Sequence, residues 1–362
     1  MNIGVVTNGL EDHGGAEVYL LECLRRWQEK AEITLYAPSL NEALLKEYGV
    51  DLHRIAYVKL TSLNAEERRF DLIEDLRVLP RLWEQMLRAH DAYFLNGFPL
   101  HFTRCHPAVF MCHEPLRMLY DLRYQHQHLH RNSQTTVHVY PEQRYRKVSA
   151  RDMEVQLGLI EAVDRGSSFS HLVANSRAMS RYVGNVYGRE ADTIVHPGIN
   201  LPNTVTDPSP GKRAIYVGRL WYHKRVDLLV RAIAHIEEGF LDIVGKGPER
   251  ESLETLAEEL GVAHRVVFHG SLSNDELAAC YEQATCGAYM SVREPFGIMP
   301  IEAAAAGRPV IASPDGGYTE LLSSDAAFFV PPNPAAIARA MHQLFEDPKL
   351  AKRMGALARE QV

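Results

Sequence analysis

The stretch AIYVGRLWYHKRVDLLVRAIAHIEEGFLDIVG, residues 214–245, contains the repeating pattern that decides the fold. Its first five residues, 214–218, form a short apolar run that ends in glycine, which predicts a buried strand. Residues 225–236 follow with the spacing of a helix, and the apolar run at 240–245 predicts a second strand. A strand, a helix and a second strand in this order predict two parallel neighbours in one sheet, with the helix packed against it.

The same alternation extends in both directions along the chain. In the C-terminal half, further strands are expected at 266–270, 286–291, 309–313 and 326–330. In the N-terminal half, strand-like runs stand at 3–7, 33–37, 92–96, 109–113, 171–175 and 193–198. The chain is therefore predicted to be an α/β protein with two Rossmann-like domains. Each would hold a doubly wound parallel sheet, and the two would face each other across a cleft.

The chain length supports this division, because 362 residues are about twice the usual size of one domain. Residues 200–212 are rich in proline and glycine and lack apolar periodicity, so the linker is expected there. The expected boundaries are 1–203 for the N-terminal domain and 204–362 for the C-terminal domain. Residues 116–164 are polar, basic and helix-like, and we interpret them as an insertion into the N-terminal domain.

The composition is typical of a folded protein, with 46% hydrophobic and 23% charged residues. No apolar run approaches the roughly 20 residues of a membrane-spanning helix, and the start of the chain lacks the pattern of a signal peptide. The five scattered cysteines form no C-x-x-C pair, which favours reduced thiols and a cytoplasmic location. The net charge of −7 argues against nucleic acid as a partner.

Positive charge is concentrated between residues 116 and 151. This segment holds six Arg and one Lys against Asp121 and Glu142, together with four histidines. One interpretation is a solvated helical surface. The other is a patch for an anionic acceptor or an anionic membrane, which would place the protein peripherally at the inner face of the membrane. The sequence leaves both interpretations open.

The strongest chemical signal is REPFGIMPIEAAAAGRPVIAS, residues 293–313. It predicts a strand end, a loop, and a helix that begins near Pro300 and ends at Gly307. Gly297 would allow the backbone to approach a ligand closely. A helix N-terminus attracts phosphate through its unpaired N–H groups and its dipole. The segment therefore predicts a phosphate site at the start of this helix.

Two glutamates in this segment predict contacts with hydroxyl groups. Glu302, expected in the first turn of the helix, can accept two hydrogen bonds from a cis-diol such as that of ribose. Glu294 can accept from the hydroxyls of a sugar in the same way. The alternative is that both are ordinary charges near a helix N-terminus. Their position between a strand end and a helix framed by glycine and proline favours binding.

A second signal follows the strand at 214–218. Gly218 ends that strand, and Arg219 and Lys224 flank the turn into the next helix, where two cations suit a diphosphate. Two ordinary surface cations are the alternative. No D-x-D motif occurs in the chain, so no metal is expected. The two cations would instead neutralise the leaving phosphate.

Two glycine loops are weaker signals of ligand contact. Gly14 and Gly15 follow the first strand and open a helix, and a plain tight turn is the alternative interpretation. Gly245 and Gly247 lie in a turn after the strand at 240–245. Because the third glycine of a dinucleotide fingerprint is missing there, we expect a turn that contacts phosphate.

Three polar residues in the N-terminal half stand directly after strands, namely His113, Glu114 and Asn175. A lone histidine at a strand end is more often a packing residue. Ligands of open α/β sheets, however, bind at the carboxyl ends of the strands, which favours a functional role. The histidines and cysteines between residues 101 and 113 match no standard zinc spacing.

Together these residues resemble glycosyltransferase family 4, the retaining group 1 glycosyl transferases of GT-B fold. The resemblance covers nearly the whole chain in the family's order, and its C-terminal motifs are the more specific. The matching motifs are GGAE (14–17), CHEP (112–115), ANS (174–176), VHPGIN (195–200), VGRL with Lys224 (217–224), VGKGPE (244–249), FHG (268–270) and EPFGIMPIEAAAAGRPVIA (294–312).

The resemblance implies a role for each matched residue. Arg219 and Lys224 would contact the donor diphosphate, and Glu302 would hold the ribose. Glu294 would hold sugar hydroxyls, and His113 would sit beside the transferred sugar. These residues, apart from Glu302, form the expected catalytic set. The further donor contacts implied are Gly15, Gly218, Gly245, Gly247, Phe296, Gly297 and Ile298, and the acceptor side implied is Gly14, Glu114, Arg117 and Asn175.

The function implied is that of a retaining hexosyltransferase. It would move a mannose, glucose or N-acetylglucosamine unit from a UDP- or GDP-sugar to a glycan, lipid-linked or small-molecule acceptor. Neither metal nor cofactor is expected, because the sugar nucleotide is a substrate. In this family the leaving phosphate is thought to take the acceptor proton on the face of attack. The alternatives are a sugar-nucleotide epimerase or phosphorylase on the same fold, and a non-catalytic protein that binds nucleotide sugars.

Overall fold

The computed structural model describes residues 1–362 except 12–13, 61–81, 98–104, 115–168 and 200–204. Two compact units result from the packing of the chain, Met1–His196 and Pro197–Val362. The expected insertion at 116–164 and the expected boundary between residues 203 and 204 both fall outside the described residues. The two units are described separately.

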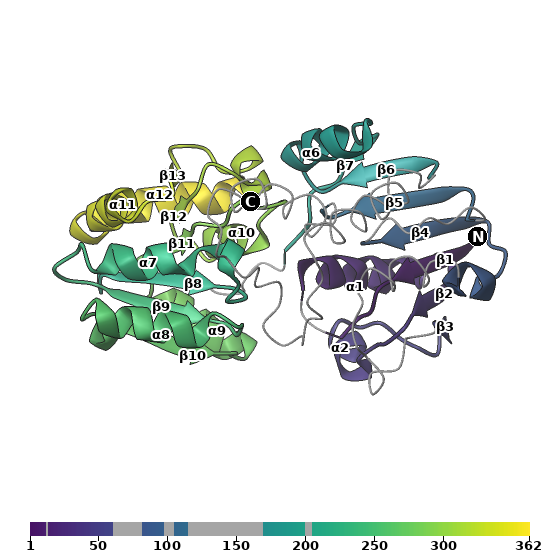
Figure 1. Ribbon diagram of the computed structural model, residues 1–362, viewed down its shortest axis with the longest axis horizontal. Coiled ribbons are helices and arrows are strands. Elements are labelled where there is room, and N and C mark those ends of the chain that lie inside the picture. The colour runs from purple at the N-terminus through teal and green to yellow at the C-terminus, as the bar shows by residue number, and fades with distance from the viewer. Residues whose placement is uncertain (12–13, 61–81, 98–104, 115–168, 200–204) are drawn as a thin grey trace, which may run out of the picture. The chain divides into compact units, whose positions relative to one another are not determined.

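The N-terminal unit is built on a seven-stranded sheet in the order β3-β2-β1-β4-β5-β6-β7, and every described pairing is parallel (Figure 1). The strand order reverses beside β1, which is the arrangement of a Rossmann-like sheet. Its described elements are β1 (Asn2–Thr7), α1 (Gly15–Trp27), β2 (Glu32–Ala37), α2 (Glu42–Glu47), β3 (Ile55–Lys59), β4 (Ala92–Asn96), β5 (Ala108–Cys112), β6 (His171–Ala174), α6 (Arg177–Tyr187) and β7 (Thr193–Ile194).

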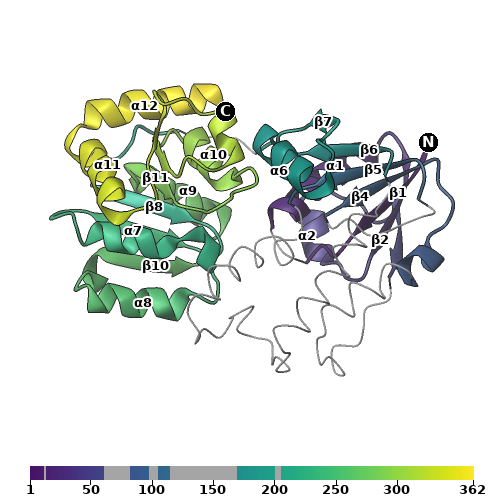
Figure 2. The ribbon, with the colours of Figure 1, turned by 45° about the horizontal axis from the view of Figure 1, so that its top comes forward.

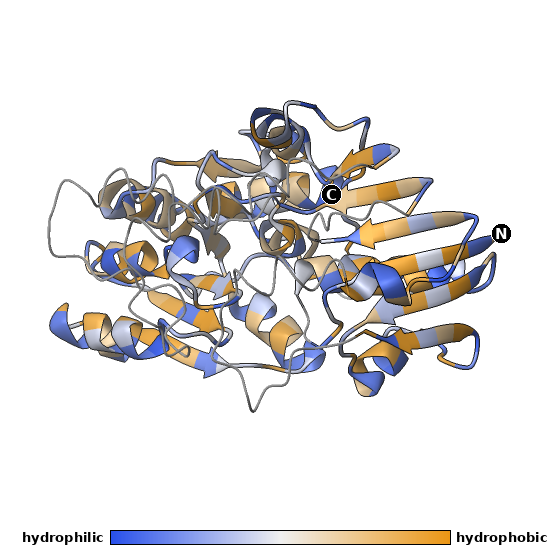
Figure 3. Cartoon of the chain, turned by 45° about the vertical axis from the view of Figure 1, so that its right-hand side comes forward, coloured by the Kyte–Doolittle hydropathy of each residue, from blue (hydrophilic) through white to orange (hydrophobic). Residues whose placement is uncertain are grey.

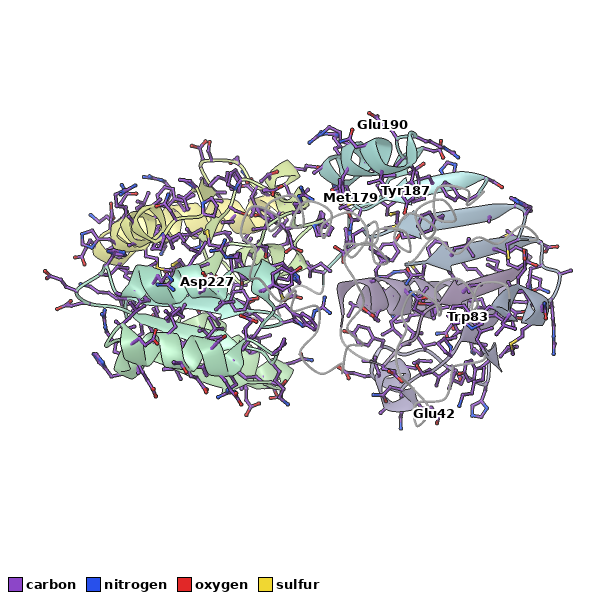
Figure 4. The ribbon with its side chains drawn as sticks, in the orientation of Figure 1. Glu42, Trp83, Met179, Tyr187, Glu190 and Asp227 are labelled. Carbon is purple, nitrogen blue, oxygen red and sulfur yellow. The ribbon has the colours of Figure 1, made fainter. Side chains whose placement is uncertain are left out.

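Helices cover both faces of this sheet. Successive strand residues point to opposite faces. Val5 accordingly packs in one apolar cluster with Leu20 of α1, whereas Val6 packs in another with Trp83 and with Met179 of α6. Figure 4 labels Trp83 and Met179. Because both faces are buried, the strands are apolar runs without polar alternation, as expected for a parallel sheet.

The C-terminal unit has a six-stranded parallel sheet in the order β10-β9-β8-β11-β12-β13. Helix α11 packs against α7 and α12, and α10 packs against α12 and β11 (Figure 2). Its elements are β8 (Arg213–Val217), the 3₁₀ turn η1 (Tyr222–Lys224), α7 (Val226–Ile233), β9 (Phe240–Val244), α8 (Arg250–Glu259), η2 (Ala263–Arg265), β10 (Val266–Gly270), α9 (Asn274–Gln283), β11 (Cys286–Tyr289), α10 (Ile298–Ala305), β12 (Val310–Ala312), η3 (Gly317–Glu320), β13 (Ala327–Phe329), α11 (Pro334–Glu346) and α12 (Pro348–Gln361).

The alanine run of α10 allows this helix to lie close to the sheet. A Cβ atom added to Gly287 of β11 would come within 2.8 Å of the Cβ of Ala303. The pair of small residues therefore sets a short distance between α10 and β11. Figure 3 shows the strands as mainly hydrophobic, while the helices also carry hydrophilic residues.

The described part of the expected linker, residues 205–212, is bound to the C-terminal unit. Arg308 is 1% exposed, and its Nη1 donates to the carbonyls of Asp207 at 2.9 Å and Ala284 at 3.0 Å. Its Nη2 donates to the hydroxyl of Thr206 at 2.9 Å. Burial lowers the pKa of this guanidinium to about 10, and these acceptors offset the cost of burying it.

The predicted fold class, two Rossmann-like domains with parallel sheets, is confirmed. The predicted position of Glu302 in the first turn of its helix is wrong. Gly297 adopts φ 89° and ends the preceding loop, so α10 begins at Ile298, two residues before Pro300. Glu302 is therefore the fifth residue of the helix and lies in its second turn.

Candidate functional site

Two neighbouring loops of the C-terminal unit, after β8 and β9, are joined by backbone hydrogen bonds. The N–H of Gly218 donates to Val244 O at 2.9 Å, and the N–H of Leu220 donates to Lys246 O at 2.8 Å. A Cβ atom at Gly245 would collide with the carbonyl of Gly218, and one at Gly247 would collide with the carbonyl of Leu220. Both glycines are therefore required for packing, and their contact with phosphate stays a prediction.

The loops after β8 and β11 bring Lys224 and Glu294 together. Lys224 Nζ lies 2.7 Å from Glu294 Oε2, and the two side chains are 18% and 12% exposed. The 3₁₀ turn that ends at Lys224 is held against the second loop, because the N–H of Val292 donates to His223 O at 2.9 Å. Each charge of this pair offsets the cost of partly removing the other from water. Two motifs that lie 70 residues apart in the sequence thus meet.

The loop between Glu294 and α10 is held by the backbone of the loop after β12. The N–H of Glu294 donates to Asp315 O at 3.2 Å, and the N–H of Tyr318 donates to Phe296 O at 2.7 Å. A side chain at Gly297 would collide with the ring of Tyr318. Gly297, the N-cap of α10, offers no side-chain hydrogen bond to the first turn. The start of α10, at Ile298, thus has the features of an anion site.

Glu302 lies on α10 in a region of low polarity. Burial raises the pKa of its carboxyl to about 7, although the residue keeps some solvent exposure. Tyr281 and Tyr289 lie close enough for the charge of Glu302 to affect their own pKa values. The hydroxyls of both tyrosines are buried. A hydroxyl-bearing ligand that donates to Glu302 would favour its charged form.

Buried tyrosines connect these groups in one region of the C-terminal unit. Tyr216 lies near both Glu294 and Arg219, and both charges affect the pKa of its hydroxyl. Burial is the largest cause of the raised pKa. The Tyr216 hydroxyl also donates to Arg219 O at 2.9 Å. Its ring lies 5.9 Å from that of Tyr289, which in turn is near Glu302. The side chain of Arg219 is exposed. The predicted donor residues of this unit therefore lie near one another.

A second polar cluster lies at the carboxyl ends of strands in the N-terminal unit. His113 follows β5, and its Nε2 lies 2.9 Å from Oδ1 of Asn96, the last residue of β4. Asn175, which follows β6, donates from Nδ2 to His113 O at 3.0 Å. The ring of Tyr19 on α1 meets the His113 ring edge-on at 5.1 Å. Burial lowers the pKa of His113 to about 4, so the ring is neutral at physiological pH.

The sequence interpretation identified His113 and Asn175 but missed Asn96 and Tyr19. Asn96 carries the same signal as His113, because it is a polar residue at the carboxyl end of an apolar strand. That signal was sufficient to find it. Tyr19 lies inside an amphipathic helix, where an aromatic residue is ordinary, and only the tertiary structure puts it beside His113.

The remaining predicted residues of the N-terminal half are less informative. Gly14 is the N-cap of α1 and Gly15 its first residue, which confirms that the two glycines open a helix. Glu114 is half-buried. Arg117 and the basic segment 116–151 lie outside the described residues.

Two further observations concern metals and membranes. Within the described ranges, no three His, Cys, Asp or Glu side chains are grouped so that they could hold a metal ion. A search of the same part of the chain for long apolar helices finds none with the length and hydropathy needed to cross a membrane.

Residues 202–361 match the family model described as glycosyl transferases group 1. The C-terminal unit carries a glycosyl transferases group 1 domain. An uncharacterized glycosyltransferase of Methanocaldococcus jannaschii is 38% identical to this chain over 154 residues, which are 41% of this chain and 40% of that protein. A D-inositol 3-phosphate glycosyltransferase of Streptomyces bingchenggensis is 32% identical over 230 residues, 55% of this chain and 49% of that protein. The chain spans about half or less of the length of these curated relatives.

The whole fold has counterparts among solved structures. The crystal structure of the Anabaena protein HepE in complex with UDP-glucose aligns with a TM-score of 0.71. The alignment covers 99% of this chain and 94% of HepE, with 20% sequence identity. At this identity the match shows a shared fold, the two-domain GT-B architecture of glycosyltransferases.

Proposed function

We propose that this protein is a metal-independent, retaining glycosyltransferase that uses a UDP- or GDP-sugar. The observation that carries the proposal is the 2.7 Å contact between Lys224 and Glu294, inside the group 1 domain. It joins a cation suited to a diphosphate and a carboxylate suited to sugar hydroxyls. The names of the relatives support sugar transfer, and the UDP-glucose in the HepE crystal structure supports a nucleotide-sugar donor.

On the donor side, charges would hold the two ends of a nucleoside diphosphate. Lys224 and the exposed Arg219 would neutralise the phosphates, which takes the place of a metal as the leaving group develops charge. The start of α10, at Gly297 and Ile298, would offer backbone N–H groups to the same phosphates. Glu302 would accept from the two ribose hydroxyls. The backbone at Phe296 and the loop at Gly218 would complete these contacts.

On the sugar side, a neutral ring and a carboxylate would contact the transferred sugar. His113 would face the transferred sugar as an uncharged ring, and Glu294 would accept from sugar hydroxyls. The acceptor hydroxyl would attack from the face that the leaving phosphate occupies, and its proton would pass to that phosphate. Gly14, Glu114 and Asn175 would lie on the acceptor side. This mechanism retains the anomeric configuration and needs no carboxylate nucleophile.

The donor hypothesis is tested by thermal unfolding with UDP-glucose, UDP-N-acetylglucosamine, GDP-mannose and ADP-glucose, each in the presence of EDTA. A ligand at about 100 times its Kd stabilises the native state by about 2.7 kcal/mol, so one donor should raise the melting temperature clearly. Lys224→Ala and Glu302→Ala should lose this stabilisation. Lys352→Ala, which removes a cation that pairs with Asp207 in the same unit, is the matched control and should keep it.

Two results would reject the proposal. One is the lack of stabilisation by any of the four sugar nucleotides. The other is stabilisation or transfer that disappears with EDTA. The anomeric configuration of a product formed with an acceptor panel, read by NMR, tests retention separately. Conversion of the donor to an isomer without an acceptor would point to an epimerase instead.

The same acceptor panel also identifies the class of acceptor. A glycan, a lipid-linked sugar and a small metabolite are the classes to include. The basic segment 116–151 is proposed to meet an anionic acceptor or an anionic membrane, because it holds an excess of five positive charges. Binding to vesicles with and without anionic lipid distinguishes these two roles.

A further inference from the structure

The amide of Asn96 has a defined orientation. Asn96 is 5% exposed, and its Nδ2 lies 3.4 Å from the carbonyl oxygen of Ala16 and 3.5 Å from the hydroxyl oxygen of Thr7. The reversed amide would bring an oxygen against the Ala16 carbonyl, two acceptors in contact. The amide oxygen Oδ1 therefore faces His113, at 2.9 Å from Nε2.

An amide oxygen only accepts hydrogen bonds, so Nε2 of His113 must carry the hydrogen. A neutral imidazole has one protonated nitrogen, which leaves Nδ1 without a hydrogen and able to accept. Burial, with no charged side chain of the described residues contributing, lowers the pKa of His113 to about 4. The ring therefore stays in this neutral form over the physiological pH range.

We propose that Asn96 is a positioning residue that holds His113 as the Nε2–H tautomer and so presents Nδ1 to a ligand hydroxyl. This inference rests on the proposed function for the identity of the ligand, a sugar. It does not need that function for the tautomer itself. Asn96 touches no reacting atom in this account and acts only through His113.

Asn175 supplies an independent observation that points to the same kind of ligand. Its Nδ2 is used in the contact with His113 O, and the residue is 4% exposed. Its Oδ1 is buried and has no hydrogen-bond partner among the described residues. Leaving a buried acceptor unpaired is costly, and such a group in a native structure calls for a ligand or a bound water.

His113 Nδ1 and Asn175 Oδ1 have no hydrogen-bond partner among the described residues, and both are acceptors. The N–H groups of Asn96, the Nε2–H of His113 and one N–H of Asn175 are directed at protein oxygens. A ligand that contacts both atoms must therefore donate hydrogen bonds, as hydroxyl groups do. The geometry thus assigns sugar hydroxyls to the N-terminal cluster, whereas the cations of the C-terminal unit suit the phosphates.

The tautomer is tested by long-range ¹H–¹⁵N NMR on the full chain with labelled histidine, with the His113 signals identified by their loss in His113→Gln. In the wild type we expect a protonated Nε2 and an unprotonated Nδ1. Asn96→Ala should give a mixture of the two tautomers. Asn96→Asp should restore the Nε2–H form, because the carboxylate oxygen that faces His113 also accepts, and should raise the pKa of His113 from about 4. Its other oxygen replaces the donor to Ala16 O, so this variant should also be less stable than the wild type.

The control variant is Asn41→Ala. Asn41 is the N-cap of α2 in the same unit, where its Oδ1 accepts from Ala43 N and Leu44 N, and it has no contact with His113. It should lower stability while leaving the His113 signals unchanged. A wild-type His113 protonated on Nδ1, or an Asn96→Ala variant with an unchanged tautomer, would overturn the proposal.

Activity gives a second readout, measured as hydrolysis of UDP-glucose. We expect Asn96→Ala to lower kcat/KM by about fivefold, the effect of one neutral hydrogen bond. Asn96→Asp should recover the wild-type kcat/KM at high pH. This kcat/KM should fall as the pH drops through the raised pKa of His113, because protonation of Nδ1 removes the acceptor. The NMR result stands if no sugar nucleotide is hydrolysed, so failure of the proposed function is distinguishable from failure of this inference.

Discussion

The two polar clusters of this protein differ in charge. In the C-terminal unit, the Lys224–Glu294 pair and the exposed Arg219 present formal charges near the start of α10. In the N-terminal unit, the cluster around His113 is built from two amides and a neutral ring. This division places formal charges in one unit and uncharged hydrogen-bonding groups in the other. The following predictions test that division, beginning with the largest expected effect.

Lys224→Ala should have the largest effect. It removes a cation from the developing phosphate charge and breaks the ion pair of the mostly buried Glu294. We expect kcat to fall by about a hundredfold to a thousandfold, or roughly 3–4 kcal/mol of transition-state stabilisation. Steady-state kinetics of donor hydrolysis provides the measurement. If Lys352→Ala reduced kcat as strongly, the effect would be general to the domain and would not locate the phosphate site.

Gly247→Ala should lower the stability of the C-terminal unit through packing alone. An added Cβ would collide with the backbone of Leu220, which cannot move without breaking its hydrogen bond to Lys246 O. The expected loss is about 1–3 kcal/mol in the free energy of unfolding, measured by urea denaturation. Gly198→Ala is the control, because a Cβ there meets nothing within 4 Å. Equal stability of the two variants would contradict the packing role.

Glu302 should make nucleotide binding depend on pH. Burial raises the pKa of its carboxyl to about 7, so the carboxyl of the free protein is partly protonated near neutral pH. Ribose hydroxyls donate to the charged carboxylate and so favour its deprotonated form. Affinity for UDP should therefore rise about tenfold from pH 6 to pH 8, because the charged fraction of the free protein rises by that factor. Calorimetric titration measures this. The same slope in Glu302→Gln would assign it to another group.

The same shift predicts how the free protein responds to pH. A carboxyl whose folded pKa lies above its unfolded value binds its proton more tightly in the native state. The contribution of Glu302 to the free energy of unfolding should therefore fall as the pH rises from about 4.5 to about 7. Glu302→Gln should flatten this part of the stability profile. An unchanged profile in the variant would show that burial does not shift this carboxyl.

The smallest expected effect is that of salt. The exposed Arg219 interacts with phosphate through a partly screened charge, so UDP affinity should weaken by about 1 kcal/mol or less between low and high ionic strength. The neutral His113 cluster should give no such dependence. The matched measurement is the ratio of kcat/KM between wild type and Asn96→Ala across the same salt range. A ratio that changed with salt would contradict a neutral cluster.

Much of this architecture was predictable from local patterns. The runs at 214–218 and 240–245 became β8 and β9 because apolar segments of five residues between helices have no other way to bury themselves. The segment 294–312 was recognised because glycine and proline mark helix ends through their own backbone geometry. The position of a residue within its helix was harder to predict. Glu302 was expected in the first turn of α10 and lies in the second.

The packing roles of Gly245 and Gly247 could not be found in the same way. A glycine between a strand and a helix is compatible with ligand contact and with a close approach of two loops. The choice depends on Gly218 and Leu220, which stand more than 20 residues away. Asn96 is a different case. Its place at the end of a strand can be predicted from the sequence, whereas its contact with His113 cannot.

Chain order, strand and helix alternation and the chemical types of the candidate groups all follow from the linear sequence, because each depends on neighbours within one or two turns. The Lys224–Glu294 contact, the raised pKa of Glu302 and the tautomer of His113 do not. Each depends on which distant residues share a small volume and on how much water remains there. Desolvation and hydrogen-bond geometry act over a few ångströms, and only the folded chain determines which groups lie within that range.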